Sequence, residues 1–151
     1  MLSEEQVKVC AILGTGFTGI IAGCLTFVSF VDVRSFITHL NNKKTELIML
    51  HFPIWWPYGR DIMVPLLVCG TICNSLTYYH TSIQGYLIAA ILIGCIGPYT
   101  AFVLGEDIDS LRKSNPKEVD LTARRFCNLH HFRLLVAIIA FGYSLHGLSE
   151  L

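Results

Sequence analysis

Charged side chains are scarce in this sequence. Asp, Glu, Lys and Arg make up 15% of the residues, whereas soluble globular proteins contain about 25%. Basic and acidic residues are equal in number, so the formal net charge is zero. This balance provides no overall positive field to attract nucleic acid, and it is unlike the strongly charged composition of disordered chains.

The sequence also lacks the common motifs of cofactor and metal chemistry. It contains neither a Cys-x2-Cys pair nor a His-Glu-x2-His segment. It has no phosphate-binding glycine loop, no Gly-x-Ser-x-Gly elbow and no dinucleotide fingerprint. Most of the six cysteines lie in apolar runs, where they favour packing over thiol chemistry. We therefore expect no metal and no cofactor.

Apolar residues are abundant instead, at 53% of the chain with a mean hydropathy of +0.56. Four segments with few or no charges are long enough to cross the ~30 Å hydrocarbon core of a bilayer as helices. They are residues 9–31, 62–79, 83–104 and 126–148. Helices are required because an open strand would leave backbone groups unpaired in lipid. The sequence predicts an all-α integral membrane four-helix bundle that forms one domain, residues 1–151.

The basic residues are unequally distributed between the two ends of the predicted spans. The connections 32–61 and 105–125 lie on the same side, and they carry Arg34, Lys43, Lys44, Arg60, Arg112, Lys113, Lys117, Arg124 and Arg125. The opposite side has only Lys8. The positive-inside rule therefore places both connections in the cytoplasm and both termini outside or in a lumen. Residues 52–58, an aromatic segment interrupted by Pro53 and Pro57, are predicted to form an interfacial anchor.

Small residues form stripes on the predicted spans, where they allow helices to approach closely. The stripe of the first span is Gly16, Gly19 and Gly23, and that of the third is Ala90, Gly94, Gly97, Ala101 and Gly105. Residues 80–82 are a short link that predicts an antiparallel hairpin of the second and third spans. Asn74, in the middle of the second span, is expected to form a hydrogen bond between helices.

His130 and Arg133 lie on the small face of the fourth span, because residues three apart share one side of a helix. That face also has Ala137, Ala140, Ser144 and Gly147. A guanidinium inside the membrane is costly unless it is paired or hydrated, so Arg133 marks a candidate site. Its expected partners are Asp32, Glu106 and Asp107. The alternative is that Arg133 extends along its helix and places its charge in the interface.

Three segments resemble a known family. They are residues 22–34, in which an apolar run leads to Asp32 and Arg34; Gly97-Pro98-Tyr99-Thr100 with an acidic sequel; and Leu129-His130-His131-Phe132-Arg133. With the four-span layout, they are similar to the anthrone-oxygenase-like family of small membrane proteins. Two positions depart from the family pattern: Phe126 replaces a Trp, and Gly105-Glu106-Asp107 replaces a stretch rich in Pro, Thr and Asn.

The resemblance implies a cofactor-free monooxygenase that acts in the lipid bilayer on a flat lipophilic phenol or quinol with O₂. The family's Leu-His-x2-Arg pattern falls on Leu129, His130 and Arg133. Under this hypothesis His130, neutral at pH 7, removes a proton, while Arg133 and Tyr99 stabilise the resulting anion. The substrate-binding residues are expected to be Asp32, Pro98, Thr100 and Asn128.

Asn128 and His131 lie on a different face of the fourth span from His130, so they reach the same cavity only if the helix is irregular there. The alternative function is a non-catalytic membrane scaffold or a lipophile-binding protein. The two hypotheses differ in the bundle interior. An enclosed cavity bordered by His130 and Arg133 favours the oxygenase, and a solid, glycine-packed interior favours the scaffold.

Overall fold

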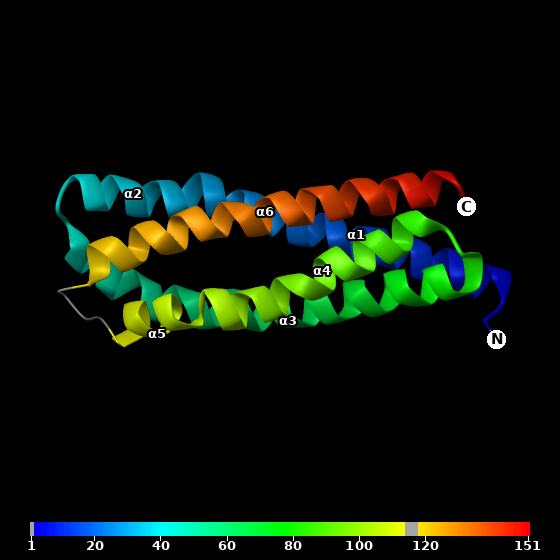
Figure 1. Ribbon diagram of the computed structural model, residues 1–151, viewed down its shortest axis with the longest axis horizontal. Coiled ribbons are helices and arrows are strands. Elements are labelled where there is room, and N and C mark those ends of the chain that lie inside the picture. Colours follow the sequence, from blue (N-terminus) through cyan, green and yellow to red (C-terminus); the bar gives the residue numbers. More distant parts are fainter. Residues whose placement is uncertain (1, 114–117) are drawn as a thin grey trace.

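The computed structural model describes residues 2–113 and 118–151, and these parts of the chain are helical without any strand. The elements are α1 (Glu4–Val28), the π-helix η1 (Ser29–Val33), α2 (Arg34–Asn41), α3 (Thr45–Thr81), α4 (Gln84–Val103), α5 (Gly105–Lys113) and α6 (Val119–Ser149). Figure 1 shows the long helices extended along one direction, with both termini at one end and the α2–α3 turn at the other.

Four helices in this part of the chain are long and apolar enough to cross a membrane. They are the continuous helix formed by α1, η1 and α2, and the helices α3, α4 and α6. α1 packs against α3 and α6, and α4 packs against the same two helices. The predicted all-α class and the four apolar helices are thus confirmed.

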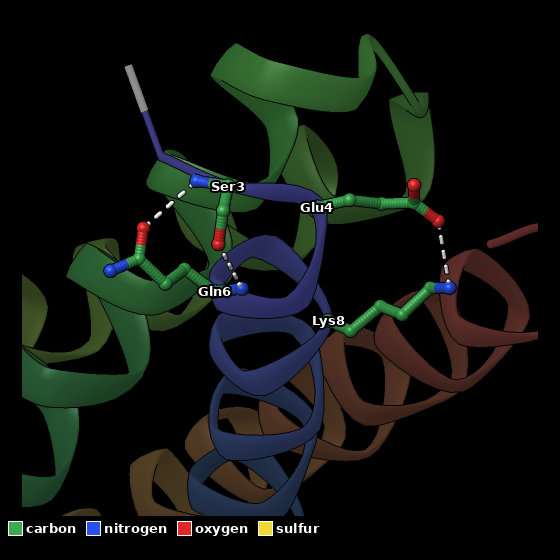
Figure 2. Close-up of polar contacts among 4 residues, drawn as sticks. All are labelled: Ser3, Glu4, Gln6 and Lys8. Atoms are coloured by element: carbon green, nitrogen blue, oxygen red, sulfur yellow. Dashed lines mark hydrogen bonds and ion pairs between the residues drawn. The ribbon is translucent and has the colours of Figure 1, made fainter.

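The first helix begins with a capping box. The Ser3 hydroxyl accepts a hydrogen bond from the backbone N–H of Gln6 at 3.2 Å, and the Gln6 side chain accepts one from the backbone N–H of Ser3 at 2.8 Å (Figure 2). An ion pair of 2.8 Å between Lys8 and Glu4 supports the same turn. Because these contacts satisfy donors that a helix start leaves free, α1 begins at Glu4, ahead of the predicted span.

The predicted connections 32–61 and 105–125 are wrong as loops. α2 and the first half of α3 occupy most of the first, and α5 and the start of α6 occupy most of the second. α3 has 37 residues, which corresponds to about 55 Å, longer than the bilayer core. It continues through Pro53, Pro57 and Pro65, although a proline inside a helix costs about 3 kcal/mol.

Burial of an aromatic face accounts for this continuous helix. Ile48 and Phe52 are fully buried, and the Phe52 ring contacts Phe36, Trp55, Trp56 and Phe126 with ring centroids 5.2 to 6.2 Å apart. Burial of the Phe52 side chain contributes roughly 2–3 kcal/mol, which opposes part of the cost of the prolines. Residues 52–58 are therefore part of a continuous packed helix, so the predicted break at the prolines is wrong, and the position of this segment at a membrane interface stays a prediction.

These aromatic residues belong to a hydrophobic cluster at the end of the bundle away from the termini. The cluster joins α2, α3, α5 and α6, and its buried members are Val33, Phe36, Leu40, Ile48, Phe52, Leu104, Ile108, Leu111, Val119, Ala123, Phe126 and Cys127. A second cluster fills the middle of the bundle with residues such as Ile21, Ile93 and Ala137. His130 lies in α6 between Phe126 of the first cluster and Ala137 of the second.

The glycines that bring helices together differ from those predicted. A Cβ added at Gly16 or Gly23 meets no atom within 4 Å, so the close helix approach predicted at these two glycines of the first stripe is wrong. Gly19 alone of the three approaches another helix, through the Phe141 ring. Among the glycines, the closest approach is instead at Gly85, where an added Cβ would lie 2.6 Å from the backbone oxygen of Tyr143. Spacing on one helix did not reveal which face the neighbouring helix covers.

A buried polar network confirms the role predicted for Asn74. Its amide nitrogen donates to Gly70 O at 2.8 Å and to Thr18 Oγ1 at 3.1 Å, and its oxygen accepts from Ser144 Oγ at 3.0 Å. Ser144 also hydrogen-bonds Thr15 at 2.8 Å. The network therefore joins α1, α3 and α6. The predicted hairpin is likewise confirmed, because only Ser82 and Ile83 separate α3 from α4.

Candidate functional site

The predicted inner face of α6 is confirmed. His130 and Arg133 expose 1% and 5% of their surface, and the small residues on the same face are also buried: Ala137, Ala140, Ser144 and Gly147. The guanidinium therefore does not extend into an interface, and that alternative is wrong. His131 is exposed on another face, with Nδ1 at 2.7 Å from Cys127 O.

The hydrogen bonds of His130 define its tautomer. Nε2 lies 3.3 Å from the backbone oxygen of Leu25 in α1, and a carbonyl oxygen only accepts, so Nε2 carries the hydrogen. Nδ1 accepts a hydrogen bond from Nη2 of Arg133, because a guanidinium only donates. These partners assign a neutral imidazole whose single acceptor nitrogen faces Arg133.

Arg133 has polar and aromatic neighbours. Nη1 donates to the Thr100 hydroxyl at 3.3 Å. The guanidinium carbon lies 6.0 Å from the Trp56 ring centroid and 5.6 Å from that of Phe126, which is within cation–π range. Nε is buried and has no hydrogen-bond partner among residues 2–113 and 118–151.

The expected carboxylate partner of Arg133 is absent. In the two described segments of the chain, no Asp or Glu forms an ion pair with it. The pairing predicted with Asp32, Glu106 or Asp107 is therefore wrong. The buried Asp107 instead lies 3.4 Å from the guanidinium of Arg125, which is exposed.

His130 and Arg133 border a cavity of about 650 Å³, within the range of about 300–1,000 Å³ typical of small-molecule pockets. Most of its lining is apolar or aromatic, including Leu25, Trp55, Trp56, Met63 and Ile96. The bundle interior is therefore not solid at the level of the His130–Arg133 pair.

The structure brings together only some of the predicted site residues. Thr100 lines the cavity with His130 and Arg133, and it bonds directly to the guanidinium. Tyr99 does not line it, because its ring packs on Phe132 with centroids 5.1 Å apart.

Three residues predicted to bind substrate also lie outside the cavity lining. Pro98 and Asn128 are exposed, and Asp32 is half-buried in η1. Asn128 lies on the outer face of α6, as its spacing from His130 predicts. No irregularity of α6 brings its side chain to the cavity.

The contribution of α3 to the site was not predicted from the sequence. Trp55, Trp56 and Gly59 line the cavity, although their segment was expected to be an irregular anchor at the membrane surface. A signal was present, because Ile48, Phe52 and Trp55 have the spacing of one helix face. Three prolines in the same region obscured this periodicity.

Comparisons with known proteins do not assign a family. The resemblance to the anthrone-oxygenase-like family therefore stays a prediction from the three sequence segments. No family model, no curated protein and no solved structure matches this chain.

Proposed function

We propose that this chain is a multi-pass membrane protein that binds a flat lipophilic phenol or quinol, in its anionic form, at Arg133. The supporting observation is the buried guanidinium without a carboxylate partner in the described segments. An uncompensated charge away from water costs several kcal/mol. A phenolate oxygen in the cavity would supply the missing negative charge and accept hydrogen bonds from the guanidinium.

The cavity lining supports a flat aromatic ligand. The rings of Trp55 and Trp56 provide planar apolar surface, and aromatic rings stack favourably in offset or edge-to-face arrangements. Arg133, His130 and the Thr100 hydroxyl are the polar groups of the lining away from the exposed Arg60, Glu106 and Asp109. This combination of extended apolar walls with a few polar groups is typical of small-molecule sites.

The membrane orientation is part of the same proposal. The uncharged residues 62–79 of α3 cross the bilayer, and the preceding part of α3 extends into the cytoplasm with α2 and α5. Both termini then lie on the outer or lumenal side, as the positive-inside rule predicts. This orientation places His130 and Arg133 inside the cytoplasmic boundary of the bilayer.

The test compares Arg133→Gln with the wild type in lipid nanodiscs, with a hydroxyanthraquinone as the probe. The wild type is expected to bind the probe and to shift its absorption to the phenolate band at neutral pH. The variant should lose this band and bind about tenfold more weakly or worse, which equals about 1.4 kcal/mol. Arg34→Gln, which changes an exposed arginine, is the control. Equal binding and an equal phenolate band in the Arg133 variant would contradict the proposal.

The cofactor-free oxygenase is a second candidate, favoured by the position of His130 Nδ1 beside the guanidinium in the cavity wall. A ligand oxygen could accept the hydrogen bond that Nη2 of Arg133 now donates to His130 Nδ1. His130 Nδ1 would then be free to accept a proton from the acidic carbon of an anthrone. The carbanion would then react with O₂, giving the anthraquinone and one molecule of water.

His130→Gln tests this reaction through O₂ uptake with an anthrone, because Gln retains an N–H donor for Leu25 O. The variant is expected to lose most of its turnover while still binding the hydroxyanthraquinone. Unchanged O₂ uptake in the variant would exclude His130 as the base.

A further inference from the structure

The cavity has a closed side and an open side. The closed side is formed by α1 and α6 through Leu25, His130 and Arg133, which are all buried. The open side is formed by α3 and α4, where Val64 is 50% exposed and Phe102 is 87% exposed. The opening therefore lies between α3 and α4, the two neighbouring helices of the hairpin in Figure 1.

Two chemically different edges border this opening. Val64, Ala101 and Phe102 form an apolar edge, and Arg60 of α3 with Glu106 and Asp109 of α5 forms a polar edge. Arg60 is exposed and paired with Asp61 at 2.7 Å, so its charge is already compensated. In the proposed membrane orientation, with the uncharged residues 62–79 of α3 in the bilayer, the apolar edge faces acyl chains and the polar edge lies at the membrane surface.

We infer that this opening is a lateral portal through which the ligand enters from the bilayer, and that the ligand is a phenol carrying an apolar chain. This inference rests on the proposed binding of the phenolic ring at Arg133. With the ring at the inner end, the chain passes over Met63 and Leu67 and leaves between Val64 and Phe102. The chain then remains in contact with lipid and does not have to enter water.

The glycines of the lining show that this space is not used for helix packing. A Cβ added at Gly59, Gly97 or Gly105 meets no atom within 4 Å, and all three residues line the cavity. A larger side chain at such a position fills the cavity without displacing a helix. Gly23 in α1 is equally free of neighbours but lies outside the cavity lining, and it provides a matched control.

Tryptophan fluorescence reports ligand entry directly, because the chain has two tryptophans and both line the cavity. The probe is an alkylphenol brominated on the ring, incorporated into nanodiscs with the wild type or a variant. The portal variants are Gly59→Leu on α3 and Ala101→Leu on α4. Gly97 is unsuitable because a side chain before Pro98 disfavours the helical conformation.

We expect the wild type and Gly23→Leu to show strong and saturable quenching. Both portal variants should need about tenfold more probe in the lipid for the same quenching. A short-chain bromophenol should quench less than the long-chain probe at equal mole fraction, and a bromoalkane without the phenol should not give saturable quenching.

The outcomes separate the portal from the site itself. If the probe quenches Gly59→Leu and Ala101→Leu as it quenches the wild type, but fails to quench Arg133→Gln, the result supports the binding site at Arg133. The same result would show that the portal is wrong. If short-chain and long-chain phenols quench equally, the inference of an apolar chain is wrong. If no phenol quenches the wild type saturably, both the site and the portal are wrong.

Discussion

Asn74 and Arg133 are both buried polar residues, but their hydrogen bonding differs. The Asn74 side chain is bonded to three helices through Gly70, Thr18 and Ser144. Arg133 keeps an unpartnered Nε and has no carboxylate partner in the described chain. A satisfied group of this kind stabilises the fold, whereas an unsatisfied cation that borders a cavity is available to a ligand.

Replacing Asn74 by Ala should destabilise the bundle by about 1–2 kcal/mol, because interhelical hydrogen bonds in membranes contribute about 0.6 kcal/mol each. The reduced free energy of unfolding should appear as a lower thermal midpoint in detergent. Ser75→Ala changes the neighbouring exposed residue and should leave the midpoint unchanged. Equal midpoints for both variants would show that the network does not stabilise the fold.

Asp107 lies outside the predicted membrane spans, and its carboxyl is expected to make the stability of the protein depend on pH. Burial raises the pKa of this carboxyl above its ordinary value, and the Arg125 guanidinium partly opposes the increase. A carboxyl with a raised pKa in the folded state favours folding while it is protonated. The stability that the protonated carboxyl contributes is lost as the pH rises from the pKa of the unfolded chain through the higher pKa of the folded state. The ionised form is therefore the destabilising one.

Asp107→Asn should remove this loss, so its thermal midpoint should exceed that of the wild type by more at neutral pH than at about pH 4. Arg125→Gln should have the opposite effect and lose more stability as the pH rises, because it removes the opposing charge. The measurement is the thermal midpoint of each protein across this pH range. A parallel pH dependence in all three proteins would contradict the assignment.

At the scale of elements, the glycine contacts determine how α4 and α6 pack. An added Cβ at Gly85 would lie 2.6 Å from Tyr143 O and 3.1 Å from Gly147 N. These are backbone atoms, so the clash is not relieved by rotating a side chain. The two helices must separate to accommodate it.

Gly85→Ala should therefore lower the thermal midpoint strongly, and Gly142→Ala should not. An added Cβ at Gly142 meets nothing within 4 Å, so that variant should gain roughly 0.5–1 kcal/mol from its better helix propensity. Both variants are measured by the same thermal melt in detergent. A gain in both would show that α4 and α6 do not make this close contact.

At the scale of the whole molecule, the helices extend beyond the thickness of one bilayer. α3 alone corresponds to about 55 Å, and the aromatic cluster with α2 and α5 packs at the end away from the termini. A membrane around the uncharged middle of the bundle leaves this end outside the lipid. The cavity then lies near the boundary between the two environments.

This arrangement predicts that the protein stays in the membrane pellet after a carbonate wash and that both termini are on one side. Tags at the two ends should become accessible to protease together, and a lysine-directed reagent should label Lys43 from the opposite side. A monodisperse protein in detergent-free buffer, or tags accessible from opposite sides, would contradict the proposed insertion.

Much of the fold follows from local properties of the sequence. The absence of charge over about 20 residues selects an apolar helix wherever it occurs, and the three-residue spacing of His130 and Arg133 places them on one face. The length of α3 could not be derived in this way. Its prolines argue locally against a helix, and the compensating burial of Phe52 involves α2 and α6.

The sequence by itself determined the four apolar helices and the inward face of α6, because both depend on residues within a few turns of one another. The tertiary structure decided that Arg133 meets His130 and Thr100 and no carboxylate of the described segments, and that a cavity opens between α3 and α4. These features depend on how helices distant in the chain are rotated and spaced, and the side chains of one helix do not fix the rotation of its neighbours.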